Sequence, residues 1–292
     1  MPALPARAWN RLPEPDDGLI AAAHAYYRAP HILPVAGSQA AIQILPTLRS
    51  RCRVGVIIPG YNEHAHAWRR SGHDVTPVVH DQIADAVDVL DVMVLIHPNN
   101  PSGQTFSREQ LLQWHAQLAA KNGWLIVDEA FMDSTPEHSI AEYCARPGLI
   151  VLRSLGKFFG LAGARVGFVC AAPELLHHIE AQHGPWTVCG PARRVATLAL
   201  QDTAWQAAAH ADLLRDAQRL SRLLTLYNLK PSGGTALFQW IATSRAASVH
   251  EALARQGVLT RLFTDPASLR FGLPANDAQW QRLESALVKT LP

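Results

Sequence analysis

The stretch "VLRSLGKFFGLAGARVGF", residues 151–168, places one lysine between an apolar run and a loop rich in glycine. Lys157 is preceded by Ser154 and followed by Arg165, so a hydroxyl and a guanidinium flank the amine along the chain. Such groups bind phosphate oxygens through strong hydrogen bonds. The stretch therefore predicts an anion site beside Lys157, although a lysine in an exposed loop is the simpler interpretation when the stretch is taken alone.

Short, almost entirely apolar runs recur before and within this stretch. They are typical of strands that are buried on both faces of a parallel sheet. Between them, residues 107–123 repeat apolar side chains at helical spacing, with Ser107 as the expected N-cap and Gly123 as the expected end. The alternation predicts an α/β fold whose mostly parallel central sheet lies between helices. The runs are "VGVIIP" (54–59), "VMVLIHP" (92–98), "WLIVDE" (124–129), "LIVLRS" (149–154) and "RVGFVCA" (165–171).

The pattern changes after about residue 195, where a long helical stretch is followed by short strands and helices. We expect an N-terminal segment at 1–34, a large domain at 35–195 and a smaller α+β domain at 196–292. A chain of 292 residues is long enough for two such domains.

Composition excludes several classes of partner. The chain holds 26 Lys+Arg against 24 Asp+Glu, without a long basic run, so we expect no nucleic-acid partner. No apolar run is long enough to cross a bilayer, and the first residues lack the pattern of a secretion signal. These features predict a cytoplasmic protein with no membrane partner.

The cysteines and histidines do not predict a metal site. The four cysteines are scattered along the chain, which favours reduced thiols over disulfides or zinc ligands. His64 and His66 lie close together, but on a helix an i, i+2 pair diverges, and metal sites need three or four converging ligands. We therefore expect no metal.

Two further features predict where a ligand would bind. Gly37, Ser38 and Gln39 precede an apolar helix, and the N-terminus of a helix attracts phosphate. Asp128 ends one predicted strand and Asn100 follows another, at the sheet edge where open α/β sheets bind ligands. For each residue, capping a turn is the alternative interpretation.

Together these residues resemble the fold-type I pyridoxal-phosphate (PLP) enzymes of the aspartate aminotransferase superfamily, from about residue 35 to the end. The motifs that carry the resemblance are "NNPSG" (99–103), "DEAF" (128–131), "SLGK" (154–157) and "GARVGF" (163–168), in the order and spacing of that superfamily.

The resemblance implies a role for each matched residue. Lys157 would bind the cofactor covalently as an imine, and Asp128 would pair with the pyridinium nitrogen. Asn100 would donate to the ring oxygen, and Tyr61 in "IPGYNEH" would stack on the ring. Arg270 in "LRFGLP" would bind the substrate carboxylate. The implied phosphate ligands are Gly37, Ser38, Gln39, Ser154 and Arg165.

Within the superfamily, the sequence is most similar to the threonine-phosphate decarboxylases of cobalamin biosynthesis. Phe131 stands where most aminotransferases have a tyrosine, which modestly favours a decarboxylase. The implied reaction converts L-threonine O-3-phosphate into (R)-1-amino-2-propanol O-2-phosphate and carbon dioxide, with Lys157 delivering a proton to Cα. The similar segments are "RLPEPDDGL" (11–19), "AGSQAAIQ" (36–43), "PGYNEHAHAW" (59–68) and "GGTALFQW" (233–240).

Two alternatives stay open. One is an aminotransferase that acts on histidinol phosphate or a similar amino acid, and the other is a non-catalytic PLP-binding relic. A dinucleotide-binding protein is excluded by the lack of a GxGxxG turn after the first strand. The residues that bind the substrate phosphate are also undecided among Arg193, Arg194 and Arg261.

The resemblance also concerns the N-terminus and the oligomer. The superfamily members begin with a further segment that carries a "STGINP"-like strand, whereas this sequence starts near "ALPARAW", so the segment at 1–34 is expected to be shorter than in relatives. Leu12 occupies the position of a tyrosine that in many relatives reaches the partner's cofactor phosphate. The resemblance implies a homodimer.

Overall fold

The computed structural model describes residues 3–290, which form two compact units. The first unit contains the chain up to Pro98 and Thr105–Thr203. The second contains Asn99–Gln104 and the chain from Ala204 onward. The division follows Thr203 instead of the expected residue 195, because helix α8 (Gly190–Gln201) packs against α2 (Leu19–Tyr27) of the first unit. The expected N-terminal segment also belongs to the first unit.

A seven-stranded sheet forms the centre of the first unit, in the order β1-β7-β6-β5-β4-β2-β3. Strands β3, β2, β4, β5 and β6 pair in parallel, and β7 runs antiparallel to β6 and β1. The predicted α/β fold with a mostly parallel sheet is confirmed. The strands are β1 (Leu33–Val35), β2 (Arg53–Ile57), β3 (Asp74–Val78), β4 (Val92–Ile96), β5 (Trp124–Asp128), β6 (Leu149–Ser154) and β7 (Gly167–Cys170).

The sequence runs predicted the central strands but not the outer ones. Strand β3 lies at one edge of the sheet and β1 at the other. Four of the five β3 residues are exposed or half-buried, so this strand lacks the continuous apolar run that marks β4 and β5. Strand β1 has only three residues, which is too short for a periodic pattern.

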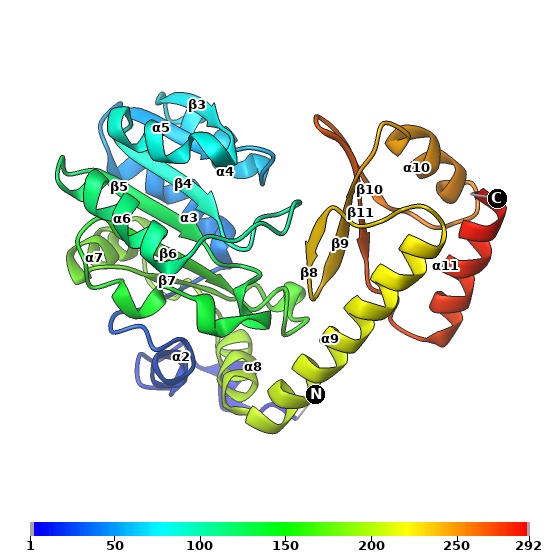
Figure 1. The fold of residues 1–292 in the computed structure, drawn as a ribbon. Coiled ribbons are helices and arrows are strands. Elements are labelled where there is room, and N and C mark those ends of the chain that lie inside the picture. Colours follow the sequence, from blue (N-terminus) through cyan, green and yellow to red (C-terminus); the bar gives the residue numbers. More distant parts are fainter. Residues whose placement is uncertain (1–2, 291–292) are drawn as a thin grey trace. The chain divides into compact units, whose positions relative to one another are not determined.

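Helices cover both faces of this sheet (Figure 1). Helix α3 packs against β6 and β7, and α4 packs against β2. Helix α6 packs against β5, and α5 contacts both α6 and β2. Besides short 3-10 turns, the other described α-helices of the unit are α1 (Arg7–Asn10), α3 (Ser38–Ile44), α4 (Asn62–Arg70), α5 (Ile83–Val89), α6 (Arg108–Ala119) and α7 (Pro173–His183).

Local signals explain α6. Ser107 Oγ accepts a hydrogen bond from the backbone N–H of Gln110, and the Gln110 side chain accepts one from the N–H of Ser107, which completes a capping box. The predicted cap is therefore correct. The helix ends at Ala119 rather than at Gly123, because Asn122 already adopts a left-handed conformation with φ of 57°.

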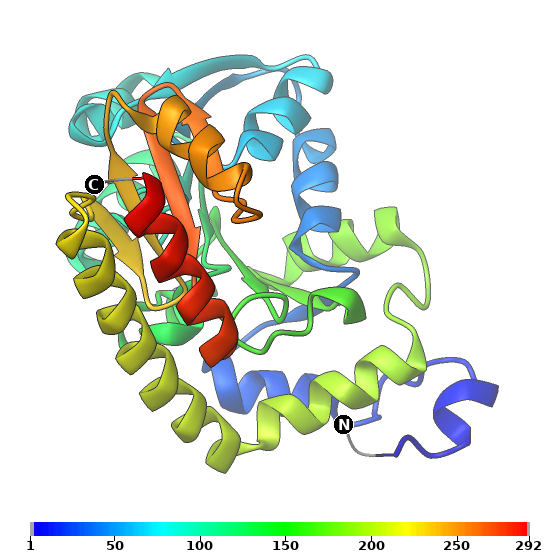
Figure 2. The same ribbon diagram turned by 90° about the vertical axis from the view of Figure 1, so that its right-hand side faces the viewer.

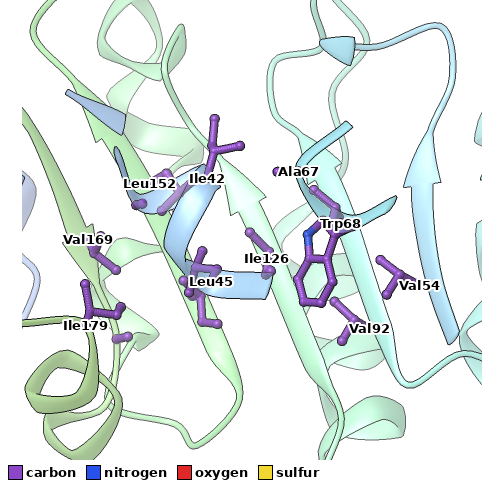
Figure 3. Packing of buried hydrophobic residues seen from close by; sticks show 14 of the residues in the cluster. Ile42, Leu45, Val54, Ala67, Trp68, Val92, Ile126, Leu152, Val169 and Ile179 are labelled. Atoms are coloured by element: carbon purple, nitrogen blue, oxygen red, sulfur yellow. The ribbon is translucent and has the colours of Figure 1, made fainter. Parts of the chain in front are cut away.

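The core on the α3 and α4 face is shown in Figure 3. Trp68 of α4 is 1% exposed and lies near Val54 and Val92. Ile42 of α3 lies on the same side of the sheet, near Leu152. Burying such a side chain contributes about 1.5–3 kcal/mol. This packing fixes the first residues of α3 and α4 relative to the strands.

The second unit contains a four-stranded antiparallel sheet in the order β10-β11-β9-β8. Its helices lie along one face of the sheet (Figure 2). Leu220, Val249 and Leu283 from three helices pack with Ile241 and Leu269 from the strands. The elements are α9 (Thr203–Leu226), β8 (Gly233–Thr235), β9 (Phe238–Ala242), α10 (Ala246–Ala254), β10 (Arg261–Thr264), β11 (Ala267–Gly272) and α11 (Asp277–Thr290).

The loop Asn99–Gln104 packs against β8 of this second unit. A Cβ atom added at Gly233 would lie 2.1 Å from the carbonyl oxygen of Ser102, and one added at Gly103 would lie 2.1 Å from the carbonyl oxygen of Gly234. Only glycine allows the two backbones to approach so closely. The Gly-Gly pair before β9 therefore holds the loop that carries Asn100.

Candidate active site

The carboxyl edge of the parallel sheet gathers several of the predicted site residues. Asp128 is the last residue of β5, and Ser154 is the last residue of the adjacent strand β6. Tyr61 follows β2 and precedes α4. Because parallel strands end at the same edge, side chains that follow different runs in the sequence meet there.

Asp128 is a buried carboxylate with two hydrogen bonds. The side chain is 4% exposed. Its Oδ2 lies 2.9 Å from Nε2 of His64, which is 1% exposed on α4. Its Oδ1 accepts a hydrogen bond from the backbone N–H of Ala130 at 3.0 Å. The two hydrogen bonds therefore hold the carboxylate in one orientation. A fixed orientation is needed if the carboxylate is to pair with a cation at a defined position.

Lys157 lies in the turn that follows β6. Its Nζ is 5.3 Å from the centroid of the Phe131 ring, within the range of a cation–π interaction. Phe131 is buried, whereas Lys157 is exposed. The amine therefore lies beside a buried aromatic ring while the residue as a whole is accessible to solvent.

The start of α3 lies beside Arg165. Gly37 has φ of 75°, and a Cβ atom added there would lie 2.6 Å from Nη2 of Arg165. Among the residues that the structure describes, none caps α3 with its side chain. The backbone N–H groups of its first turn and the guanidinium thus form a positive region, and its use by a phosphate stays a prediction.

Ser154 belongs to the same region. It is the cross-strand partner of Gly167, and a Cβ atom added at Gly167 would lie 2.5 Å from the backbone nitrogen of Ser38. Ser154 Oγ accepts a hydrogen bond from the N–H of Gly156 at 3.2 Å. The structure therefore brings Ser38, Ser154 and Arg165 together around one sheet edge.

Gln39 joins α3 to α4. The Tyr61 hydroxyl donates to Gln39 Oε1 at 3.2 Å, and Gln39 Nε2 donates to Glu63 Oε2 at 3.1 Å. Burial and the nearby carboxylates of Glu63 and Asp128 raise the pKa of the Tyr61 hydroxyl, so it remains a donor. The Tyr61 ring is 40% exposed and available for stacking.

Two other predicted residues meet in the second unit. Arg270 on β11 donates to the Oδ1 atom of Asn100. The cross-strand partner of Arg270 is Arg261 on β10, and the guanidinium of Arg270 also lies 5.1 Å from the centroid of the Phe238 ring. Burial lowers the pKa of Arg270, and the charge of Arg261 lowers it further.

Comparison with known proteins identifies the family of the chain. The sequence profile described as "Aminotransferase class I and II" matches residues 7–287. The chain belongs to the aminotransferase class I and II family. The match includes both compact units and all residues of the candidate site.

Relatives of this aminotransferase-family chain cover nearly its whole length. It is 54% identical to a threonine-phosphate decarboxylase of Pseudomonas aeruginosa over 288 residues, which are 99% of this chain and 87% of that protein. It is 40% identical to a threonine-phosphate decarboxylase of a Sinorhizobium species, over 99% of this chain and 88% of that protein.

A solved structure shows the same fold. The histidinol-phosphate aminotransferase of Sinorhizobium meliloti, in complex with pyridoxal-5'-phosphate, matches this family member with a TM-score of 0.85 and 20% identity. The match covers 96% of this chain and 83% of that chain. This likeness concerns the fold alone.

Sequence reasoning missed the role of His64 in this family member. It considered the residue only as a metal ligand. The signal that could have found it is the spacing Tyr61–His64, because three positions after the helix N-cap the side chain turns toward the sheet edge. Within residues 3–290, no cluster of His, Cys, Asp and Glu side chains has the arrangement of a metal site.

The three arginines considered for the substrate phosphate have different surroundings. Arg193 is buried, and it binds Asp17 through two hydrogen bonds of 2.5 and 2.8 Å, so its guanidinium already has an anionic partner. Arg194 lines a cavity of about 560 Å³ near the start of α8. Arg261 is exposed beside Arg270.

Over the described part of this family member, each helix is too short or too polar to cross a membrane.

Proposed function

We propose that the chain is a PLP-dependent decarboxylase that converts L-threonine O-3-phosphate into (R)-1-amino-2-propanol O-2-phosphate and carbon dioxide in cobalamin biosynthesis. The observation that carries this proposal is the 54% identity to a threonine-phosphate decarboxylase over 99% of the chain. The candidate site retains the lysine, the buried carboxylate and the positive region that such an enzyme needs.

The residues present fit pyridoxal phosphate. The uncapped start of α3 with Arg165 suits a phosphate, and the buried, hydrogen-bonded Asp128 suits a ring nitrogen that carries a proton. Lys157 would hold the aldehyde carbon covalently. When bound, the cofactor supplies an electron sink for the bond that breaks at the substrate Cα.

The residues of the chain then have separate tasks. Asp128, oriented by His64 and by the Ala130 N–H, would keep a proton on the ring nitrogen. Tyr61 would cover one face of the ring, and Asn100 would donate to the ring oxygen. Lys157 would deliver a proton to Cα. Phe131 offers no hydroxyl near the amine, unlike the tyrosine that most aminotransferases have there.

Two arginines of the second unit suit a substrate with two anionic groups. Arg261 and Arg270 are directly opposite each other on β10 and β11, and like charges in that position repel. Among the described residues, Arg261 has no carboxylate within ion-pair distance. We assign the substrate carboxylate to Arg270 and the substrate phosphate to Arg261, because bound anions would remove this repulsion.

The aminotransferase alternative uses the same anchor residues and differs in its second half-reaction with glutamate. The relic alternative is disfavoured by the retained Lys157 and by the hydrogen bonds that hold Asp128. A single experiment separates all three. Purified protein with pyridoxal phosphate and L-threonine O-3-phosphate should release carbon dioxide and the amino-propanol phosphate, with no requirement for 2-oxoglutarate.

The controls for this experiment are histidinol phosphate as substrate and the variant Lys157→Ala. Amino transfer between histidinol phosphate and 2-oxoglutarate, without carbon dioxide from threonine phosphate, would replace the decarboxylase with the aminotransferase. If the protein binds the cofactor but converts neither substrate, only the alternative of a non-catalytic PLP-binding relic would remain.

We also propose a cytoplasmic homodimer. The family resemblance supports the dimer, and the exposed side chains of Trp9 and Trp186 offer apolar surface for a partner. The four cysteines are free, as expected in a reducing compartment. Light scattering should give twice the mass of the chain, and fractionation should place the protein with cytoplasmic enzymes.

A further inference from the structure

A buried ion cluster contains the residues next to Asp128 and Ser154 in the sequence. It consists of Arg153 on β6, Glu129 after β5 and Asp133 in the following segment. Arg153 forms ion pairs with both carboxylates, at 2.6 Å for Asp133. All three side chains are at most 2% exposed. The proposed chemistry uses none of them.

The ion cluster and the site lie on opposite faces of the sheet. Successive side chains of a strand point to opposite faces. Leu152 belongs to the core beneath α3 and α4, so Ser154 shares that face and Arg153 points to the other. In the adjacent strand, Ile126 belongs to the same core, which places Asp128 on the site face and Glu129 opposite.

Arg153 forms ion pairs with both ends of the segment 129–133, and the ring of Phe131 in this segment lies near the Lys157 amine. Glu129 and Asp133 bracket Phe131, and the Lys157 amine lies 5.3 Å from the Phe131 ring. Arg153 itself precedes Lys157 by four residues, in the strand that leads to it. One guanidinium thus links the strand that leads to the lysine to the segment that begins beside Asp128.

We propose that Arg153 is a positioning residue: through its two buried ion pairs it sets the spacing between Lys157 and the segment Asp128–Phe131. This inference rests on the cofactor role of Lys157 and Asp128 in the proposed function. The planar guanidinium suits the task because it holds two carboxylates at fixed angles, which a lysine ammonium cannot do.

A purely stabilising role explains the ion cluster less well. Buried ion pairs are often no more stabilising than apolar side chains of the same volume. Here one cation faces two carboxylates, and among residues 3–290 neither Arg153 Nε nor the Tyr27 hydroxyl has a hydrogen-bond partner. Burial raises the pKa of Asp133. Such an arrangement contributes little to the free energy of folding. Two directional contacts from one side chain do, however, fix the relative positions of β6 and the segment after β5.

Helix α2 closes the ion cluster. The guanidinium carbon of Arg153 lies 4.5 Å from the centroid of the Tyr27 ring, and the Tyr27 ring contacts Phe168 at 5.4 Å. Glu129 is held further by the backbone N–H of Ile140 at 2.9 Å. Charges that are removed from water in this way interact more strongly than exposed ones.

The test compares Arg153→Lys with a matched surface variant. Arg51 also binds a carboxylate, Asp74, through two hydrogen bonds, but that pair is exposed at the opposite end of the sheet from Lys157. Arg51→Lys is therefore the control. The measurements are the pH midpoint of the visible absorption of bound pyridoxal phosphate, the cofactor dissociation constant, and kcat and KM.

We expect Arg153→Lys to shift the pH midpoint and to lower kcat about 10- to 100-fold with little change in KM, because small misplacements of reacting groups cost that much. Arg51→Lys should match the wild type in every measurement. A lower melting temperature for Arg153→Lys, with the pH midpoint and kcat of the wild type, would overturn the proposal.

A second variant covers the case in which Arg153→Lys does not fold. The triple variant Arg153→Met, Glu129→Gln, Asp133→Asn removes every charge of the ion cluster and so leaves no unpaired buried ion. We expect it to bind the cofactor with a shifted pH midpoint and reduced kcat, and wild-type values would again overturn the proposal. Failure of the wild-type protein to bind pyridoxal phosphate would instead reject the proposed function.

Discussion

His64 Nε2 and Asp128 Oδ2 lie 2.9 Å apart in a part of the protein where both side chains are almost completely buried. The pair joins α4 to the end of β5 and orients the carboxylate that the proposed function assigns to the cofactor ring. An ionised carboxylate only accepts hydrogen bonds, so the imidazole donates through Nε2.

Replacing His64 should destabilise the protein. His64→Leu leaves a buried carboxylate with one donor fewer, and a hydrogen bond to a charged group contributes about 1.5–3 kcal/mol. We expect the free energy of unfolding in urea to fall by about that amount, with weaker cofactor binding. His66→Leu, an exposed neighbour on the same helix, is the control. Equal unfolding curves for the two variants would contradict the assignment.

Gly37 should be needed for binding of the cofactor phosphate. Gly37→Ala places a Cβ atom 2.6 Å from Arg165 Nη2 in a backbone conformation with φ of 75° and ψ of 155°, which strains a residue with a side chain by about 1–3 kcal/mol. We expect the dissociation constant for pyridoxal phosphate, measured by fluorescence, to rise about tenfold. Gly163→Ala has open space around its Cβ and should bind as the wild type does. Identical affinities for the two variants would refute the phosphate site.

Asp17 should stabilise the fold only above acidic pH. Burial alone would raise the pKa of its carboxyl, but the hydrogen bonds from Arg193 and from the Leu19 N–H outweigh it, and the pKa is lowered. The resulting stability is present above the ordinary pKa of about 3.9 and is lost as the pH falls through the lower value of the folded state.

Asp17→Asn tests this dependence. At pH 7 we expect the free energy of unfolding to fall by about 1 kcal/mol, since the pair is partly exposed. The difference from the wild type should shrink as the pH drops below 4. Asp16→Asn, an exposed neighbour, should have little effect. A difference for Asp17→Asn that does not depend on pH would disprove the linkage.

Arg261 should distinguish phosphorylated from unphosphorylated substrate. Arg261→Gln removes the cation that we assign to the substrate phosphate, so KM for L-threonine O-3-phosphate should rise about 10- to 100-fold, as expected for a lost charged hydrogen bond. Cofactor affinity should not change. Arg245→Gln is an exposed control in the same unit. An unchanged KM would show that Arg261 does not bind the substrate phosphate and that another residue does.

Much of the fold followed from local patterns. The apolar runs marked the central strands, because residues buried on both faces leave no polar positions, and Ser107 marked the start of α6. The site residues after β2, β5 and β6 were predictable because parallel strands end at one edge.

The features that the sequence did not reveal depend on contacts between distant segments. The burial of Arg193 depends on Asp17, which lies 176 residues away along the chain. The ion cluster joins Arg153 to carboxylates from another strand. The loop that carries Asn100 packs against Gly233, which sequence spacing could not indicate. Periodicity reports which residues are buried but not against which partner.

The most direct test of the central claim is the site of cofactor attachment. The lysines of the chain are Lys121, Lys157, Lys230 and Lys289. After incubation with pyridoxal phosphate, reduction with borohydride and digestion, mass spectrometry should find the pyridoxyl-phosphate group on the peptide that contains Lys157. Its absence from that peptide, with label on another lysine or on none, would contradict the account.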